Sequence, residues 1–163
     1  MSAAMSIVRA DGEGEHRRFW GGGVLTMKAT AEETAGAFLL FEDFMTQGKV
    51  TPRHRHPDVD ETLYVLDGEI LVHLHGREQR VGTGGIVVAP RGVPHAFLVT
   101  SDTARLLCLT TPGSAESFYR NASEPATAAN LGGSGPVDVA RVQESARQTG
   151  ATEILGPPPF EPT

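Results

Sequence analysis

The sequence predicts an all-β protein, a double-stranded β-helix (jelly roll) with a short helical extension at its C-terminal end. Short segments rich in β-branched and aromatic residues follow one another between residues 37 and 110, and turns containing Gly or Pro separate them. Asp67-Gly68 between two such segments is a strong hairpin signal. After Thr111-Pro112 the apolar residues follow helical spacing instead. Many short strands with such turns favour two packed sheets that close on each other.

Residues 1–35 are predicted to form an N-terminal arm with short strands. The arm is polar as far as Gly21-Gly22-Gly23, and a short strand is expected over residues 24–29. The polar residues 30–34 are expected to form one helical turn. Phe19 and Trp20 are the aromatic exceptions, and we expect them to anchor an edge strand.

Residues 36–112 are predicted to form the barrel itself. Its first strand does not alternate cleanly between apolar and polar residues, as expected of a strand that is covered on both faces. The strands are expected at residues 37–45, 61–66, 69–75, 79–81, 86–89, 95–100 and 104–110.

Residues 113–163 are predicted to form a helical extension and a proline-rich tail, within one domain overall. Ser114 is a candidate N-cap for a helix over residues 115–121, with Phe118 and Ala122 on one side. A second helix is expected over residues 136–148. Pro136 lies in its first turn, its apolar stripe is Val139, Val142 and Ala146, and Gly150 ends it.

Composition excludes several classes of function. The formal charge is −6 with only 14 Lys and Arg residues, so the chain lacks the basic surface of a nucleic-acid-binding protein. It also lacks an apolar run of eighteen residues and a secretion signal, so we expect a cytoplasmic protein without membrane contact. The single cysteine, Cys108, fits a reducing compartment and is expected to be a small apolar filler of a buried strand.

Four residues have the types and spacing of a metal site. His54 and His56 are two apart in a strand-like segment, so both imidazoles point to the same face. Glu61 begins the next predicted strand and can bring a carboxylate to that face, and His95 follows a second stretch punctuated by Gly and Pro. Three imidazoles and one carboxylate favour a single divalent transition ion, namely Fe, Ni, Mn, Cu or Zn, over Ca²⁺ or Mg²⁺.

The barrel residues beside these ligands are expected to line a substrate pocket. Leu63 and Val65 follow Glu61 at a period of two, and Phe97 follows His95 in the same way. Such a pocket is apolar and suits an aromatic or other hydrophobic small molecule. Within it, Glu61 can act as a catalytic base toward an acidic hydroxyl group of the substrate.

Other interpretations of the same residues remain open. The three histidines can be ordinary polar loop residues, or the metal can serve only to stabilise the barrel. The pair His73 and His75 also points two imidazoles to one face, but without a carboxylate nearby, so it is expected to face solvent or a subunit boundary. Tyr64 alternates away from Glu61 and is expected to be a packing residue.

Two stretches resemble motifs 1 and 2 of the cupin superfamily. The first runs from Gly48 to Gly68 and contains His54, His56 and Glu61, and the second runs from Gly84 to His95. The fifteen residues between them are similar to the spacing of single-domain bacterial cupins. The family's second motif usually closes with Asn, but Val99 stands at that position here. This difference puts hydrogen bonding around the ligands in doubt, and it leaves the ligand set intact.

The stretch after the barrel resembles bacterial quercetin 2,3-dioxygenase-like cupins. The resemblance is carried by Thr111-Pro112-Gly113, Phe118-Tyr119 and Glu124-Pro125-Ala126. It implies a dioxygenase that acts on a small aromatic or enolic substrate, with the metal holding the substrate and Glu61 taking its proton. It also implies a homodimer. The alternatives are a non-catalytic metal cupin that binds a small molecule, and a cupin isomerase or cyclase.

Overall fold

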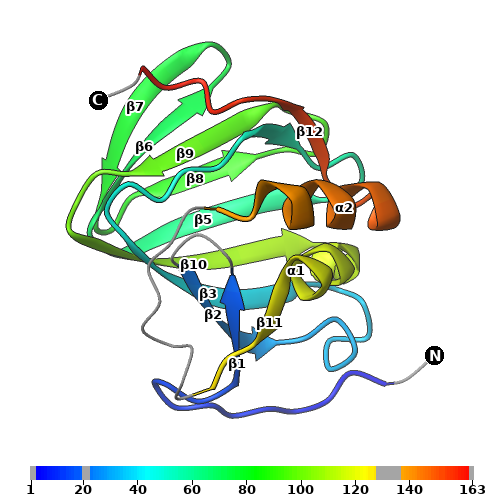
Figure 1. Cartoon of the computed structure of the whole chain (residues 1–163). Coiled ribbons are helices and arrows are strands. Elements are labelled where there is room, and N and C mark those ends of the chain that lie inside the picture. Colours follow the sequence, from blue (N-terminus) through cyan, green and yellow to red (C-terminus); the bar gives the residue numbers. More distant parts are fainter. Residues whose placement is uncertain (1–2, 20–22, 128–136, 162–163) are drawn as a thin grey trace.

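The computed structural model describes residues 3–19, 23–127 and 137–161. Within these residues two β-sheets face each other and enclose the hydrophobic core (Figure 1). The larger sheet has the strand order β11-β1-β2-β3-β10-β5-β8, and the smaller has the order β12-β4-β9-β6-β7. The strand pairs in both sheets are antiparallel. The predicted jelly roll with a short helical extension is confirmed.

The barrel strands lie close to the predicted ranges. They are β3 (Leu39–Thr46), β4 (Arg53–Arg55), β5 (Asp60–Asp67), β6 (Glu69–Leu74), β7 (Arg77–Gly82), β8 (Ile86–Ala89), β9 (His95–Val99) and β10 (Thr103–Thr111). The turn between β5 and β6 needs glycine at position 68, where φ is +85° and a Cβ atom would lie 2.3 Å from the carbonyl oxygen of Thr103. The hairpin prediction is nevertheless wrong, because β5 and β6 lie in different sheets and do not pair, and the turn carries the chain from one sheet to the other. The hairpin joins β6 to β7 instead.

The N-terminal arm is part of the larger sheet. Its strands β1 (Glu15–Phe19) and β2 (Gly23–Ala29) pair with each other, and β1 also pairs with β11 (Ser123–Pro125), which the sequence did not predict. Arg17 fixes this contact because its buried guanidinium donates a hydrogen bond of 2.8 Å to the Ser123 hydroxyl group. Phe19 packs partly against the core, whereas the expectation for Trp20 lies outside the described residues.

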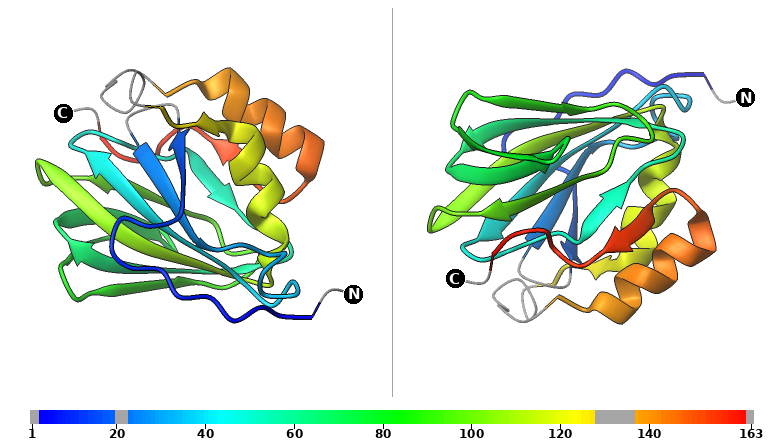
Figure 2. Two further views of the ribbon diagram at one scale, coloured as in Figure 1. Left: turned by 90° about the horizontal axis from the view of Figure 1, so that it is seen from below. Right: turned by 90° about the horizontal axis from the view of Figure 1, so that it is seen from above.

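The C-terminal extension forms two helices that lie side by side at one end of the barrel (Figure 2). A 3₁₀ turn, η1 (Gly113–Ala115), leads into α1 (Glu116–Ala122), and α2 (Val139–Thr149) follows. Val142 and Ala146 are buried as predicted, but Val139, the first residue of the helix, is 56% exposed. The predicted cap Ser114 makes no cap hydrogen bond, and Pro136 lies outside the described residues.

A further strand, β12 (Glu153–Gly156), covers the edge of the smaller sheet. It pairs with β4, and Glu153 forms an ion pair with Arg55. β4 is therefore not an open edge, because the chain returns to it after α2, although the Arg55 side chain remains 42% exposed.

The second histidine pair does not share a face. His73 lies in β6, whereas His75 lies in the turn after it with φ +51°, so the alternation of the strand stops before His75. His73 is half-buried, and its ring lies 6.5 Å from that of Phe160 in the tail. The prediction of two imidazoles on one face is therefore wrong.

The outer face of the larger sheet carries exposed apolar side chains. Tyr64 points away from Glu61 and is 41% exposed, and Ile86 and Val88 on the neighbouring strand are exposed as well. Homodimer formation stays a prediction, and these three side chains are a candidate surface for it.

Among the described residues, no helix combines the length and the apolar character that crossing a bilayer requires.

Candidate metal centre

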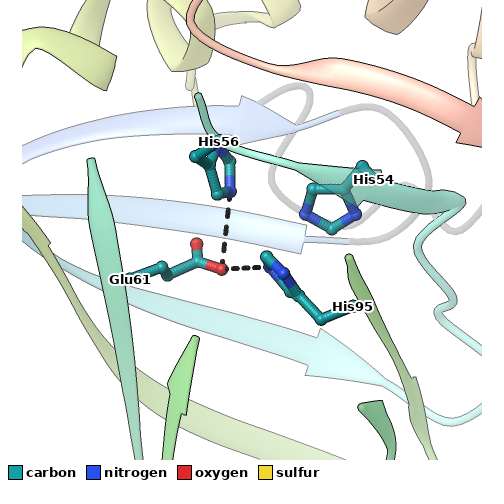
Figure 3. A group of neighbouring side chains, drawn as sticks. All are labelled: His54, His56, Glu61 and His95. Carbon is teal, nitrogen blue, oxygen red and sulfur yellow. Dashed lines mark hydrogen bonds and ion pairs between the residues drawn. The ribbon is translucent and has the colours of Figure 1, made fainter. Parts of the chain in front are cut away.

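The four predicted ligands meet inside the barrel (Figure 3). His54 lies in β4, His56 follows it, Glu61 lies in β5 and His95 begins β9. Their relative exposures are 9%, 2%, 6% and 3%, and one ligand atom from each lies within 4.8 Å of the others. The structure thus brings together residues that are far apart in the sequence, as the spacing predicted.

Strand register explains why they meet. His54 and His95 are directly opposite each other in β4 and β9 of the smaller sheet. Glu61 comes from the facing sheet, where it lies opposite Thr110 of β10. The chain between the two sheets is held by Gly92, whose N–H donates a hydrogen bond of 2.7 Å to the His56 carbonyl oxygen. The cluster therefore joins both sheets at one end of the barrel.

Backbone carbonyl groups orient the three imidazole rings. Nδ1 of His54 lies 2.8 Å from the Pro52 oxygen, and Nδ1 of His95 lies 2.9 Å from the Val93 oxygen. Nδ1 of His56 lies 3.2 Å from the oxygen of Ala151. Because a carbonyl oxygen can only accept, each Nδ1 must carry the proton. Each Nε2 is then left with a lone pair for the centre of the cluster.

This arrangement fits a bound cation. Nε2 of His95 lies 2.8 Å from Oε2 of Glu61, and Nε2 of His56 lies 3.5 Å from the same oxygen. His56 Nε2 is buried and has no hydrogen-bond partner among the described residues. Adjacent ligands about 2.1 Å from an ion lie about 3 Å apart, so the spacing suits a metal ion held between them. The donor types favour a divalent transition ion.

Burial and mutual contact set the charge states. Burial, with the charges of the neighbouring histidines, lowers the pKa of His54 to about 3. Burial acts to raise the pKa of the Glu61 carboxyl group, but His56 and His95 outweigh it and hold that pKa well below its usual value. Burial also acts to lower the pKa of His95, but its contacts with Glu61 raise it. A metal ion therefore competes with a proton mainly at His95.

Tyr119 is a site residue that the sequence reasoning did not identify. Its hydroxyl group donates a hydrogen bond of 2.9 Å to Oε1 of Glu61, the oxygen that the histidines do not contact. The buried ring packs 4.7 Å from that of Phe41 between their centroids. Its position in α1, next to Phe118 on the predicted inward side, was the available signal. Tyr119 thus fixes the orientation of the Glu61 carboxylate.

The segment after α2 also reaches the cluster. The Thr152 hydroxyl group lies 3.1 Å from Nδ1 of His56, beside the Ala151 carbonyl oxygen. These residues are separated from His56 by 95 and 96 positions. No local pattern in the sequence could predict that contact.

We expect Thr152→Val to weaken metal binding by about tenfold, because partners of this kind typically contribute 10–100-fold to metal affinity and Ala151 still holds the ring. Competition with a chelator measures the change. Thr103→Val, an exposed threonine of β10, is the control and should leave the affinity unchanged. Equal affinities for both variants would show that Thr152 does not support His56.

A mostly apolar cavity of about 80 Å³ adjoins the cluster. Leu63 and Phe97 line it, as predicted, together with His54, His56 and Glu61. Val65 does not, because it lies further along β5, where it is fully buried in the core. The prediction for Val65 is corrected accordingly.

Cys108 is another lining residue. It is 4% exposed, and burial raises the pKa of its thiol well above the usual value. The thiol therefore stays protonated and fills space, as the sequence predicted.

A larger groove of about 940 Å³ lies beside the cavity. The two share lining residues from the segment before β4 and from the extension, namely Val50, Pro52, Val137, Val142, Thr152 and Ile154. The C-terminal extension therefore forms the wall between the cavity and the outside.

The comparisons with known proteins agree with this geometry. The family model described as "Cupin domain" matches residues 40–111, which carry all four candidate ligands. The chain belongs to the cupin superfamily. This cupin is 30% identical to quercetin 2,3-dioxygenase of Bacillus subtilis (strain 168) over 121 residues, which are 74% of this chain and 36% of that protein. It thus spans little more than a third of that relative's length.

Two solved structures are similar to this cupin. KdgF from Halomonas sp. superposes with a TM-score of 0.58 at 21% identity, over 63% of this chain and 92% of that one. The polyketide cyclase RemF from Streptomyces resistomycificus gives a TM-score of 0.57 at 26% identity, over 66% and 80%. The first likeness concerns the fold alone, and the second extends over most of a protein described as a cyclase.

Proposed function

We propose that this cupin is a metal-dependent dioxygenase for a small aromatic or enolic substrate. One observation supports the proposal most directly. The four-ligand cluster borders a buried apolar cavity, while Tyr119 holds the second oxygen of the Glu61 carboxylate. The similarity to quercetin 2,3-dioxygenase gives separate support.

His54, His56, Glu61 and His95 are the residues that would hold the ion. When bound, a divalent transition ion would supply Lewis-acid polarisation of a substrate oxygen, and a redox-active one would also supply electron transfer with dioxygen. Iron, nickel, manganese, copper and zinc all accept these donor types.

Glu61 is the proposed base. Its carboxylate is buried and lies beside the place where a substrate oxygen would meet the ion. Because the pKa of Glu61 is held well below its usual value, the carboxylate is a weak base. It can accept a proton only from an acidic hydroxyl group, such as an enol or a phenol whose oxygen the cation polarises. The acidity of that hydroxyl group defines the substrate class.

The cavity walls position the substrate. Leu63 and Phe97 offer apolar contacts for a ring and would exclude water from the reacting atoms. The cavity itself has room for little more than one ring. A substrate with several rings must therefore extend through the wall that Pro52, Val142 and Ile154 share with the groove.

The proposal is tested by metal reconstitution. Metal-free protein is loaded separately with iron, nickel, manganese, copper or zinc, and dioxygen uptake is followed with quercetin and with a 1,3-diketone. We expect one dioxygen consumed per substrate with at least one redox-active ion, and no uptake with zinc. Absence of dioxygen uptake with every ion and both substrate classes would rule out the proposed dioxygenase activity.

A ring-closing activity is the second candidate. The cupin covers 80% of the cyclase RemF, at 26% identity, but only 36% of the dioxygenase. An ion that polarises a carbonyl group, with Glu61 removing an acidic proton, suffices for a ring closure that consumes no dioxygen. Conversion of a linear poly-β-ketone without oxygen would favour this activity, and binding without any turnover would favour a non-catalytic cupin.

A further inference from the structure

The cavity is also lined by a polar side chain that is not one of the four candidate metal ligands. Asp43 of β3 faces into the barrel, in register with Leu106 of β10. Its Oδ1 is buried and has no hydrogen-bond partner among the described residues. A buried acceptor without a partner costs about 1–3 kcal/mol, so such an atom in a cavity indicates a group that binds there.

Lys49 lies at the same end of the cavity. Its residue is only 7% exposed, and its ammonium group lies 4.7 Å from the ring centroid of Phe19. The backbone is fixed because the Val99 N–H donates a hydrogen bond of 2.8 Å to the Lys49 carbonyl oxygen. The cavity therefore has an acceptor and a donor at the end opposite the metal ligands.

The rows of inward-facing side chains show how the two ends are related. Glu61 lies in register with Thr110 and Leu39, and Asp43 lies four residues further along β3 than Leu39. The row between them consists of Phe41, Cys108 and Leu63, which all line the cavity. An apolar stretch of wall thus separates two polar ends.

Electrostatics agree with this geometry. Burial raises the pKa of Asp43 to about 6, although the positive charge of Lys49 opposes the shift, and the charge of Glu61 adds to it. Burial also lowers the pKa of Lys49, against the attraction of Asp43. Both groups lose hydration in the barrel, and a ligand that hydrogen-bonds to Oδ1 of Asp43 would restore part of what that carboxylate loses.

We propose that Asp43 and Lys49 form a polar subsite that binds a hydroxyl group on an aromatic ring of the ligand. Oδ1 of Asp43 accepts the hydroxyl proton in a hydrogen bond, and the Lys49 ammonium group donates to a ligand oxygen. The ring lies against the apolar row of Phe41, Cys108 and Leu63. The subsite deepens the proposed function, on which it rests for the use of this cavity, and it narrows the substrate class to hydroxylated aromatic compounds.

The test uses the zinc-loaded full chain, which is expected to bind ligand without turnover, at pH 8, above the pKa of about 6 for Asp43. Calorimetry compares quercetin with 3-hydroxyflavone, which keeps the enolic hydroxyl group and lacks the other four. Wild type is expected to prefer quercetin. Asp43→Asn should weaken quercetin binding about tenfold, since hydrogen bonds to charged groups contribute about 1.5–3 kcal/mol. Binding of 3-hydroxyflavone should stay within twofold.

A second variant distinguishes loss of the subsite from a folding defect caused by an unpaired buried charge. The double change Asp43→Leu with Lys49→Met leaves no uncompensated charge in the barrel, and it should reduce the affinity for quercetin to that for 3-hydroxyflavone. Glu42→Gln is the matched control, because this neighbouring carboxylate of β3 pairs with Arg105 instead. It should leave both affinities unchanged, and metal content should be equal in all variants.

The outcomes separate the subsite from the proposed reaction. If wild type binds both compounds alike or binds neither, or if the variants bind them as wild type does, the subsite is overturned. The Asp43–Lys49 pair is then structural or holds only water. If the preference for quercetin over 3-hydroxyflavone depends on Asp43 but no metal supports dioxygen uptake, the proposed dioxygenase activity is excluded and the proposed subsite is supported.

Discussion

Replacing His54 by alanine is expected to lower metal affinity by more than about 100-fold and to abolish turnover. Loss of an outer hydrogen-bond partner alone costs about 10–100-fold, and removal of a ligand should cost more. The reason is geometric, because His54 lies directly opposite His95 and the smaller sheet would then contribute only two imidazoles. Metal content after dialysis against a chelator measures the effect.

His73→Ala is the matched control for this experiment. His73 lies in β6 of the same sheet, and it is not part of the ligand cluster. It should retain one ion per chain. If His54→Ala also retains one ion with unchanged affinity, the cluster is not the metal centre, and the proposed chemistry loses its basis.

The same variant tests whether the ion serves only to stabilise the barrel. The core is built from buried apolar side chains of both sheets, including Phe41, Ile70 and Leu106, and these do not depend on the ligands. We expect His54→Ala to keep a cooperative thermal transition and the β-sheet circular dichroism spectrum. Global unfolding on loss of the ion would instead favour a structural role.

Local spacing was enough to predict the ligand cluster and most strands. A period of two placed His54 and His56 on one face, and Gly and Pro marked the turns that return Glu61 and His95 to it. The same rule failed for Val65, because sharing a face does not fix how far along the barrel a side chain lies. It failed for His75 because a turn ends the strand one residue earlier.

What the sequence did not reveal depends on the path of the C-terminal extension. Contacts from Tyr119 to Glu61, and from Thr152 to His56, require α1, α2 and β12 to fold back over one end of the barrel.

For Asp43, in contrast, the sequence did contain a signal. It occupies an inward position in alternation with Leu39, Phe41 and Met45, where an acid is out of place unless it has a partner.

Glu61→Gln is expected to reduce the rate of substrate-dependent dioxygen uptake by about 10²–10⁴-fold, the usual contribution of a general base. The amide keeps the shape of the side chain but cannot accept the substrate proton. Three imidazoles remain to hold the ion, so uptake should be compared at equal metal loading. Wild-type uptake at equal loading would exclude Glu61 as the base.

Tyr119→Phe separates the orientation of Glu61 from its basicity. The variant removes the 2.9 Å hydrogen bond to Oε1 but leaves the carboxylate in place, so we expect a smaller loss in kcat, of about tenfold. The loss should shrink for substrates with a more acidic hydroxyl group, because these need less help from a well-placed base. Tyr64→Phe is the matched control, since this second tyrosine points outward from the strand that carries Glu61. Equal rates for both variants would mean that the Tyr119 contact plays no part in the reaction, and that Glu61 is held in position by the ion and the histidines alone.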